Sequence, residues 1–152
     1  LSTLHTNDSV AAIDRLADIG VEPYLISSAL RGVISQRLVR KVCPHCKKAY
    51  RPNAGELELL GLPADSDTQF YRGEGCEECY HTGYRGRRAV FEILTVSGKV
   101  RRLISEGASY DKRYAAVREG NFVTMRENCR DLVLRGETTA AEAAKAINST
   151  VD

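Results

Sequence analysis

The sequence predicts a mixed α/β fragment in which helical segments flank a small module rich in cysteine. Three observations predict this class. Apolar residues recur at helical spacing towards both ends of the chain, short runs typical of strands lie in its middle, and four of the five cysteines form two close pairs there. The 152 residues suffice for one average domain or two small ones, and we divide them into the ranges 1–42, 43–95 and 96–152.

The first range opens with two predicted helices. Asn7 or Asp8 is placed to cap a first helix that ends at Gly20, and Pro23 suits the first turn of a second. The expected apolar stripe of the second helix is Leu25, Ile26, Ala29, Leu30 and Val33. The segment Ser35–Val42 forms either the last turns of that helix or a short strand, and its periodicity leaves both open.

The second range is expected to hold one short helix and two strands. Asn53 is placed to cap the helix, which ends at Gly61. Gln69–Arg72 and Arg88–Leu94 have the composition of strands. Such a small core depends on a further cross-link for its stability.

The third range is predicted to be entirely helical. Ser97 caps one helix, and Tyr110–Glu119 forms the next. Thr124-x-x-Glu127 and Thr139-x-x-Glu142 match the capping-box pattern and open two more helices, the first of which Gly136 ends. Short helices joined by short loops predict a compact helical subdomain, in which Cys129 is a small core or boundary residue.

Composition and charge exclude several classes of protein. A net charge of +2 is too small to indicate nucleic acid or an anionic membrane as a partner. No run approaches the roughly 20 apolar residues of a membrane span, and the start of the chain has no signal-peptide pattern. Because the sequence begins at Leu1 without Met, we expect an N-terminal part to be absent from it.

The cysteine pairs predict a metal site. Cys43-Pro44-His45-Cys46 and Cys76-Glu77-Glu78-Cys79 are separated by 29 residues. Two such knuckles supply the four sulfurs of a tetrahedral zinc site. Since four thiolates leave no position for water, the predicted Zn²⁺ is structural and not catalytic.

Other uses of these cysteines stay open at this point. Disulfides need an oxidising compartment, and a redox pair needs only one knuckle. His45 or His81 lies close enough in sequence to replace one cysteine as a ligand.

No complete catalytic constellation occurs in the chain. The pair Gly98-Lys99 lacks the glycine spacing of a phosphate loop. Neither a nucleophile elbow nor an H-E-x-x-H zinc helix is present. The sequence therefore predicts no enzymatic activity for these residues alone.

Several runs nevertheless resemble one known family. They are Leu1–Asp8, Gly20–Ile26, Gln36–Cys46, Cys76–Cys79, Gly83–Arg88, Phe91-Glu92 and Gly136–Thr139. Together they resemble the type II secretion and type IV pilus assembly ATPases of the GspE and PilB type over nearly the whole chain. The combination is specific, because the retraction-type ATPases of the same superfamily generally lack the four cysteines. The sequence departs from the family at Asn128-Cys129, where Asp-Gly is usual.

The resemblance implies a cytoplasmic, hexameric P-loop ATPase that works peripherally at the inner membrane face. In that family ATP hydrolysis with Mg²⁺ drives protein secretion or pilus assembly, and the partners are other copies of the ATPase, a membrane platform protein and cytoplasmic docking proteins. Range 1–42 would then be the end of a RecA-like core, 43–95 a zinc module and 96–152 a helical subdomain. The phosphate loop and the acidic Walker B segment precede this region in the family, so we expect the fragment alone to be inactive.

The same resemblance assigns roles to three residues. His5 falls in the family's histidine box, at the end of a core strand, which implies sensing of the terminal phosphate. Gln36 and Arg37 fall in its Gln-Arg-Leu segment and imply contact with nucleotide or with a neighbouring subunit. From the residues alone, Arg37 belongs to a solvated basic rim around the thiolates, together with Arg40, Lys41, Lys47, Lys48 and Arg51.

Two further interpretations compete with the ATPase. A stand-alone zinc ribbon would bind nucleic acid through its basic knuckle, but Glu74, Glu77 and Glu78 make the second knuckle acidic, and no aromatic residues alternate with the basic ones. A purely structural docking module would present its surface to the membrane platform protein, which is compatible with an ATPase parent.

Overall fold

The computed structural model describes residues 1–148, and residues 149–152 at the end of the third predicted range lie outside the described part. Among the described residues, no helix is both long and apolar enough to cross a membrane. The helices are α1 (Ala11–Asp18), α2 (Pro23–Ala29), α3 (Ala54–Leu59), α4 (Gly98–Ser105), α5 (Tyr110–Arg118), α6 (Met125–Leu134) and α7 (Ala140–Ile147), with a short 3-10 helix η1 (Glu77–Cys79). The strands are β1 (Gly32–Val42), β2 (Lys47–Tyr50), β3 (Phe70–Gly73) and β4 (Tyr84–Thr95). The mixed α/β class is thus confirmed for the described chain.

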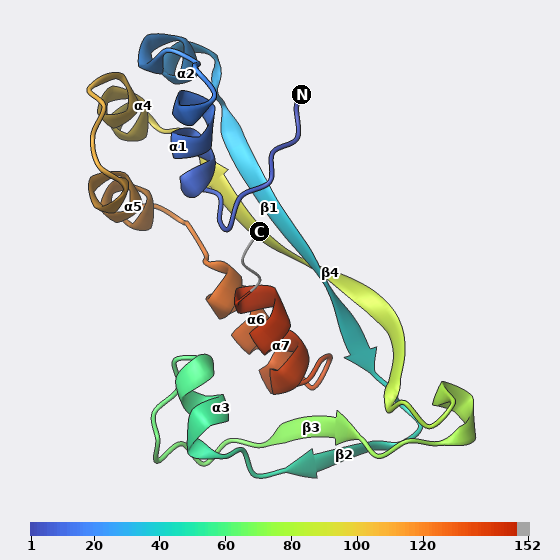
Figure 1. Ribbon diagram of the computed structural model, residues 1–152. Coiled ribbons are helices and arrows are strands. Elements are labelled where there is room, and N and C mark those ends of the chain that lie inside the picture. The colour runs from blue at the N-terminus through green and yellow to red at the C-terminus, as the bar shows by residue number, and fades with distance from the viewer. Residues whose placement is uncertain (149–152) are drawn as a thin grey trace. The chain divides into compact units, whose positions relative to one another are not determined.

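The chain forms two compact units, and both draw on separate stretches of sequence. Within residues 1–148 the first unit contains Leu1–Ser35 and Phe91–Thr124, and the second contains Gln36–Val90 and residues 125–148. The long strands β1 and β4 pair with each other, and each has residues in both units (Figure 1). In the second unit β2 pairs antiparallel with β3, with Lys47 opposite Gly73 and Tyr50 opposite Phe70.

The first two helices begin close to where the sequence predicts, although the N-cap residue of α1 is Val10 and not Asn7 or Asp8. The Asp8 carboxylate accepts hydrogen bonds from the amides of Val10 and Ala11, at 2.8 and 2.7 Å, and so satisfies donors at the start of α1. Gly20 follows the end of α1 with a φ of +91°, a left-handed conformation that glycine adopts without strain. Pro23 is the first residue of α2.

The predicted apolar stripe of the second helix is wrong at its first residue and in its later part. Leu25 is exposed, Leu30 has an extended backbone after the end of α2, and Val33 belongs to β1. Pairing with β4 decides this boundary. A side chain at Gly32 would place its Cβ 2.8 Å from the carbonyl oxygen of Leu94, so the chain is already packed against the strand there. Ser35–Val42 is accordingly strand, not helix.

The first unit closes around one apolar cluster. Its buried members come from α1, α2, α4, α5, the end of β4 and the residues that follow β4 and α5. They are Val10, Ile13, Ile26, Leu94, Val96, Val100, Ile104, Ala116, Val117 and Phe122. Ser97 caps α4 as predicted, its hydroxyl accepting from the amide of Val100 at 3.3 Å. The second predicted helix of this range is α5, which ends one residue before Glu119.

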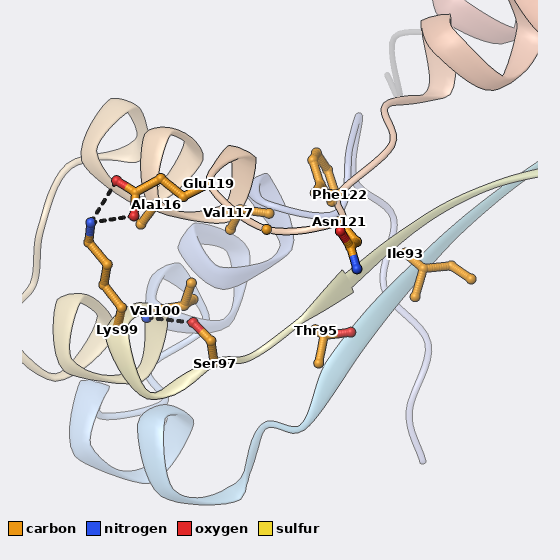
Figure 2. A pocket seen from close by; sticks show the side chains of 11 residues that line it. Ile93, Thr95, Ser97, Lys99, Val100, Ala116, Val117, Glu119, Asn121 and Phe122 are labelled. Atoms are coloured by element: carbon orange, nitrogen blue, oxygen red, sulfur yellow. Dashed lines mark hydrogen bonds and ion pairs between the residues drawn. The ribbon is translucent and has the colours of Figure 1, made fainter.

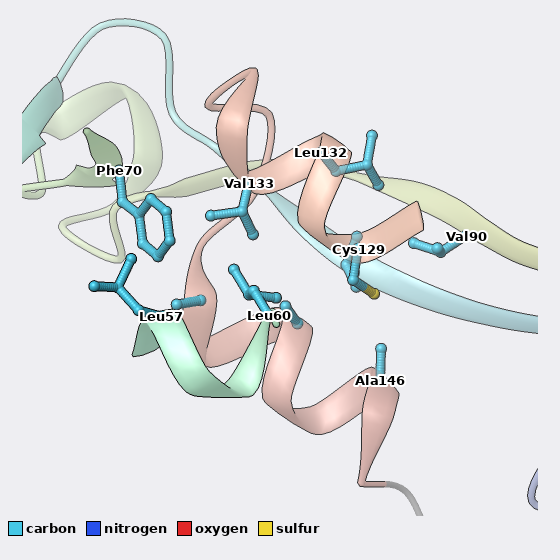
Figure 3. Packing of buried hydrophobic residues seen from close by; sticks show 11 residues of the cluster. Leu57, Leu60, Phe70, Val90, Cys129, Leu132, Val133 and Ala146 are labelled. Carbon is cyan, nitrogen blue, oxygen red and sulfur yellow. The ribbon is translucent and has the colours of Figure 1, made fainter. Parts of the chain in front are cut away.

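The second unit closes around another cluster. The buried members are Val39, Leu57, Leu60, Phe70, Val90, Cys129, Leu132, Val133, Ala140, Ala143 and Ala146. Figure 3 shows Leu57 of α3 and Leu60, the residue after that helix, reaching towards Phe70 of β3 and Val133 of α6. Cys129 is fully buried there, which confirms it as a core residue, and burial raises the pKa of its thiol to about 11. Helix α6 runs unbroken through Asn128-Cys129.

Local capping in this unit follows the sequence with one exception. Asn53 and Glu56 form a complete capping box at the start of α3. At α7 the Thr139 hydroxyl accepts from the amide of Glu142 at 3.2 Å, as expected. The Glu142 side chain does not return to the cap, however, because its carboxylate binds Arg40 on β1.

Candidate metal centre

The four paired cysteines come together in the second unit. Their sulfur atoms all lie within 4.8 Å of one another. The Sγ distances are 3.9 Å for Cys43–Cys76, 3.9 Å for Cys46–Cys79 and 3.7 Å for Cys76–Cys79. A tetrahedral zinc with Zn–S bonds of about 2.3 Å requires sulfurs about 3.8 Å apart. The spacing and the all-sulfur donor set therefore fit a metal site of this kind.

Two glycines close the loop that carries the second cysteine knuckle. A Cβ at Gly73 would collide with the backbone of Gly83, and a Cβ at Gly83 would lie 2.5 Å from the carbonyl oxygen of Gly73. The Gly83 carbonyl also accepts a hydrogen bond from the amide of Cys43 at 2.9 Å. The end of β3 and the residue before β4 therefore meet backbone to backbone and close the loop that carries the second knuckle. The Cys43–Gly83 hydrogen bond, with that from the Glu74 amide to the Cys46 carbonyl at 3.1 Å, joins this loop to the first knuckle.

Backbone amides surround the sulfurs. The amides of Cys76 and Gly83 each donate to Cys79 Sγ at 3.2 Å, and the Gly75 amide donates to Cys46 Sγ at 3.3 Å. Burial alone would raise the pKa of Cys79, but these two amide donors outweigh it and lower the pKa to about 6. Burial raises the pKa of Cys76 to about 12 and also raises the pKa of Cys46. Amide donors aimed at sulfur favour the thiolate form in which cysteine binds metal.

The other uses of the cysteines find no support in the geometry. All five cysteines are free thiols, and the sulfurs of Cys76 and Cys79 lie 3.7 Å apart, far beyond a disulfide bond. His45 and His81 are exposed, and the cluster that the described residues form consists of the four cysteines without them.

The predicted basic rim is largely neutralised by partners. Lys48 pairs with Glu74 at 2.6 Å, and Arg51 pairs with Asp67. Lys47 lies over the ring of Tyr71, with Nζ 4.4 Å from the ring centroid. These side chains are not free cations turned towards the thiolates, because nearby acidic and aromatic groups that are distant in sequence bind them.

The loop between α6 and α7 holds the strand that leads to Cys43. The Val42 amide donates to the Glu137 carbonyl at 2.9 Å, and the Thr138 hydroxyl donates to the Arg40 carbonyl at 2.8 Å. The Arg40 guanidinium donates to Glu142 at 2.8 Å and lies 3.9 Å from the ring centroid of Tyr84. The end of β1 is thereby fixed by two hydrogen bonds to its backbone, one ion pair and one cation–π contact.

Among the residues that hold the end of β1, Glu142 is the one whose role the sequence did not indicate. Burial by itself would raise the pKa of this carboxyl, but hydrogen bonds from the Arg40 side chain and amide, together with Lys145, lower the pKa to about 2. The capping-box pattern explained the glutamate locally. Nothing in the sequence indicates a partner 102 residues away.

The cysteine cluster and the loop that braces it lie within a region that matches a known family. The sequence pattern described as "Type II/IV secretion system protein" matches residues 1–145. The chain belongs to this family. Within it, the chain is 41% identical over 145 residues to the type II secretion system protein E of Pseudomonas aeruginosa, with 95% of the chain and 29% of that protein covered. It is 45% identical over 145 residues to the type IV pilus assembly ATPase PilB of Thermus thermophilus, with 93% of the chain and 16% of that protein covered.

A third relative is the type II secretion system ATPase E of Vibrio cholerae, 39% identical over 145 residues, with 95% of the chain and 29% of that protein covered. The secretion-family chain thus spans less than a third of the length of these relatives. The family match confirms the resemblance drawn from the motifs of the chain.

The other predicted site residues are His5, Gln36 and Arg37, and none of them belongs to the cysteine cluster. His5 is exposed, in the first unit, within residues 1–6 that have no regular secondary structure. Gln36 and Arg37 lie in the part of β1 that belongs to the second unit, where Gln36 is exposed and Arg37 is half-buried. The strand that the resemblance implies before His5 is not formed by the described residues.

The first unit also contains a cavity of about 500 Å³ that sequence reasoning did not anticipate. Apolar side chains of β4, α4 and α5 form part of its wall, and the exposed Lys99–Glu119 ion pair lies at its rim (Figure 2). None of the predicted site residues lines it.

Proposed function

We propose that the chain is the C-terminal part of a cytoplasmic, hexameric ATPase that powers protein secretion across an outer membrane or the assembly of type IV pili. The observation that carries this proposal is the match over about 95% of the chain to proteins named for those two systems. The chain contains no phosphate-loop sequence. The nucleotide-binding residues of the complete protein are therefore expected in the part of the relatives that the chain does not cover.

We assign the cysteine cluster to one structural zinc ion held by Cys43, Cys46, Cys76 and Cys79. The sulfur spacing supports this assignment, as do the amide donors at Cys46 and Cys79. When bound, the ion supplies a closed cross-link between the two knuckles and no catalytic water. The cysteine side chains contribute the ligands, and the backbone hydrogen bonds Cys43–Gly83 and Glu74–Cys46 hold the two knuckles together.

We further propose the site roles and domain assignments implied by the family. Residues 1–42 would end a RecA-like core in which His5 lies near the terminal phosphate of ATP bound with Mg²⁺, and Gln36 and Arg37 would contact nucleotide or the adjacent subunit. Residues 43–95 would be the zinc module and 96–152 the helical subdomain. The expected partners are other copies of the ATPase, an inner-membrane platform protein and cytoplasmic docking proteins, reached from the cytoplasmic face.

The test compares the 152-residue chain with the full-length parent in a phosphate-release assay containing ATP and Mg²⁺. We expect turnover by the parent alone, because the chain lacks a phosphate loop. Turnover by the isolated chain would contradict the assignment of the chemistry to the remainder of the protein. A full-length parent that hydrolyses no ATP under any assembly condition would contradict the proposed function itself.

A further inference from the structure

A buried polar contact in the first unit joins two residues 83 positions apart. The amide of Ser9 donates to Glu92 Oε1 at 2.9 Å, and the Ser9 hydroxyl donates to the same oxygen at 2.6 Å. Ser9 is completely buried and Glu92 is 5% exposed. A carboxylate oxygen that receives two donors from one residue, both out of water, holds that residue in a narrow range of positions.

The residue before Ser9 is held as firmly. One oxygen of Asp8 accepts from the amides at the start of α1, and its other oxygen accepts from the hydroxyl of Tyr110 on α5 at 3.1 Å. The hydroxyl of Thr6 donates to the Asp8 carbonyl at 3.0 Å and extends the contacts to the residue that follows His5. The stretch Thr6–Ser9 is therefore bound to its own backbone, to β4 and to α5.

Packing alone does not account for this arrangement. The neighbouring Val10 and Ile13 already bury apolar surface in the cluster that contains Leu94. Placing a carboxylate in such surroundings carries a desolvation cost, and an apolar pair of similar volume would stabilise a core at least as well. What the Ser9–Glu92 contact adds is a fixed position for the chain just after residues 1–5, which have no regular structure of their own.

We propose that Glu92 is a positioning residue: by holding Ser9 against β4, it sets where the chain enters α1 and therefore where the preceding His5 lies. This inference rests on the proposed function, in which His5 lies near the terminal phosphate. Glu92 acts through the backbone of residues 6–9 and does not itself contact nucleotide. The arrangement links the strand that follows the second cysteine knuckle in sequence to the segment assigned to phosphate sensing.

The experiment uses the full-length parent and the variants Glu92→Ala, Ser9→Ala and His5→Ala, alone and combined. Steady-state ATP hydrolysis gives kcat and KM, and hydrogen exchange followed by mass spectrometry reports on the peptide that covers residues 6–12. We expect Glu92→Ala to lower kcat about tenfold, with KM for ATP changed less than about twofold. Exchange in residues 6–12 should rise about tenfold or more, since the Ser9 amide loses its acceptor. Ser9→Ala, which keeps the amide donor, should give a smaller change in both readouts.

A double-mutant cycle separates positioning from general destabilisation. If Glu92 acts through His5, then Glu92→Ala lowers kcat no further in the His5→Ala background. Glu119→Gln serves as the matched control, because it removes an exposed carboxylate of the same unit, and it should leave kcat and exchange unchanged. Circular dichroism and zinc content identify any variant that fails to fold, and Ser9→Ala then carries the comparison.

The outcomes are distinct. Fully additive losses in the cycle, or unchanged exchange at residues 6–12 in Glu92→Ala, overturn the inference. Wild-type turnover by His5→Ala also overturns it while leaving the proposed ATPase function intact. A parent without ATPase activity defeats the proposed function instead, and the positional role of Glu92 is then decided by the exchange data alone.

Discussion

Within residues 1–148 the two units bury apolar clusters of nearly equal size, ten residues in the first and eleven in the second, yet they close these clusters by different means. In the first unit four helices, α1, α2, α4 and α5, pack together with the end of β4 (Figure 1). In the second, one face depends on a two-stranded ribbon of four-residue strands and on the six-residue helix α3. Isolated elements this short are marginal in water. The comparison teaches that similar cores need different supports when the elements around them differ in length.

The largest difference between the two units is expected when a proposed metal ligand is removed. We expect Cys43→Ser to lose the bound zinc and to expose the second unit to rapid hydrogen exchange, while α1, α2, α4 and α5 keep their protection. Structural zinc in small domains contributes on the order of 10 kcal/mol to folding, so the loss should exceed any other single change considered below. Elemental analysis and exchange mass spectrometry provide the measurements.

Cys129→Ala is the matched control for this experiment, because it removes a buried thiol of the same unit that is not one of the four clustered cysteines. It should retain one zinc per chain. Loss of protection in both units alike after Cys43→Ser would show that the first unit also depends on the metal.

The next largest effects are expected when one core residue in each unit is truncated and the losses of stability are compared. Phe70 is fully buried and makes an edge-to-face contact with Tyr50, with ring centroids 6.3 Å apart, and Leu94 is fully buried in the first unit. With zinc bound, we expect Phe70→Ala to cost about 3–5 kcal/mol and Leu94→Ala about 2–5 kcal/mol. Chemical denaturation of the zinc-loaded protein measures both. A cost below about 1 kcal/mol for Phe70→Ala would mean that the metal alone closes the second unit.

Acid should weaken the second unit through Glu142. The pKa of this carboxyl is about 2 in the folded chain, below its usual value of 4.5, so its contribution is complete above about pH 4.5 and declines as the pH falls towards 2. We expect Glu142→Gln to lose about 2–3 kcal/mol at pH 7. Denaturation from pH 7 to pH 2.5 should show the gap between the two proteins narrowing, and metal loss affects both alike. A gap that stays constant with pH would contradict the role of the charge.

Removing the helix caps tests the smallest difference. Ser97→Ala, at α4 of the first unit, should cost about 1 kcal/mol, the ordinary value for an N-cap. Thr139→Ala, at α7 of the second unit, should cost more, because the buried Thr139 hydroxyl also lies 3.0 Å from the Tyr84 hydroxyl. Thermal unfolding of the two variants beside the parent chain gives the comparison. Equal shifts would show that the contact with Tyr84 adds nothing.

Local signals account for much of the fold. Asp8, Pro23, Asn53 and Ser97 mark helix starts that the structure contains, since caps act within one turn of the chain. The segment Ser35–Val42 was undecidable locally, because its periodicity suits helix and strand, and pairing with β4 makes it strand. The capping residues thus needed no partner distant in sequence, whereas the strand did.

The candidate site divides in the same way. The four cysteines could be named from sequence because two C-x-x-C knuckles restrict the geometry so strongly. The partners of the basic residues near them could not, because Lys48 meets Glu74 and Arg40 meets Glu142 only after the chain folds. Glu142 shows why: its local capping pattern was correct for the helix start and gave no sign of where the carboxylate would go.

By itself, the sequence determined the family, the four cysteines that form the candidate metal site and most of the helix starts, because each of these depends on residue types at short, fixed spacing. Only the tertiary structure decided that two units form from interleaved stretches, that Gly73 and Gly83 meet, and that Ser9 is bound by Glu92. The physical reason is that such contacts depend on how the whole chain packs. Ser9 and Glu92, for example, are 83 positions apart, and no local sequence pattern predicts that they meet.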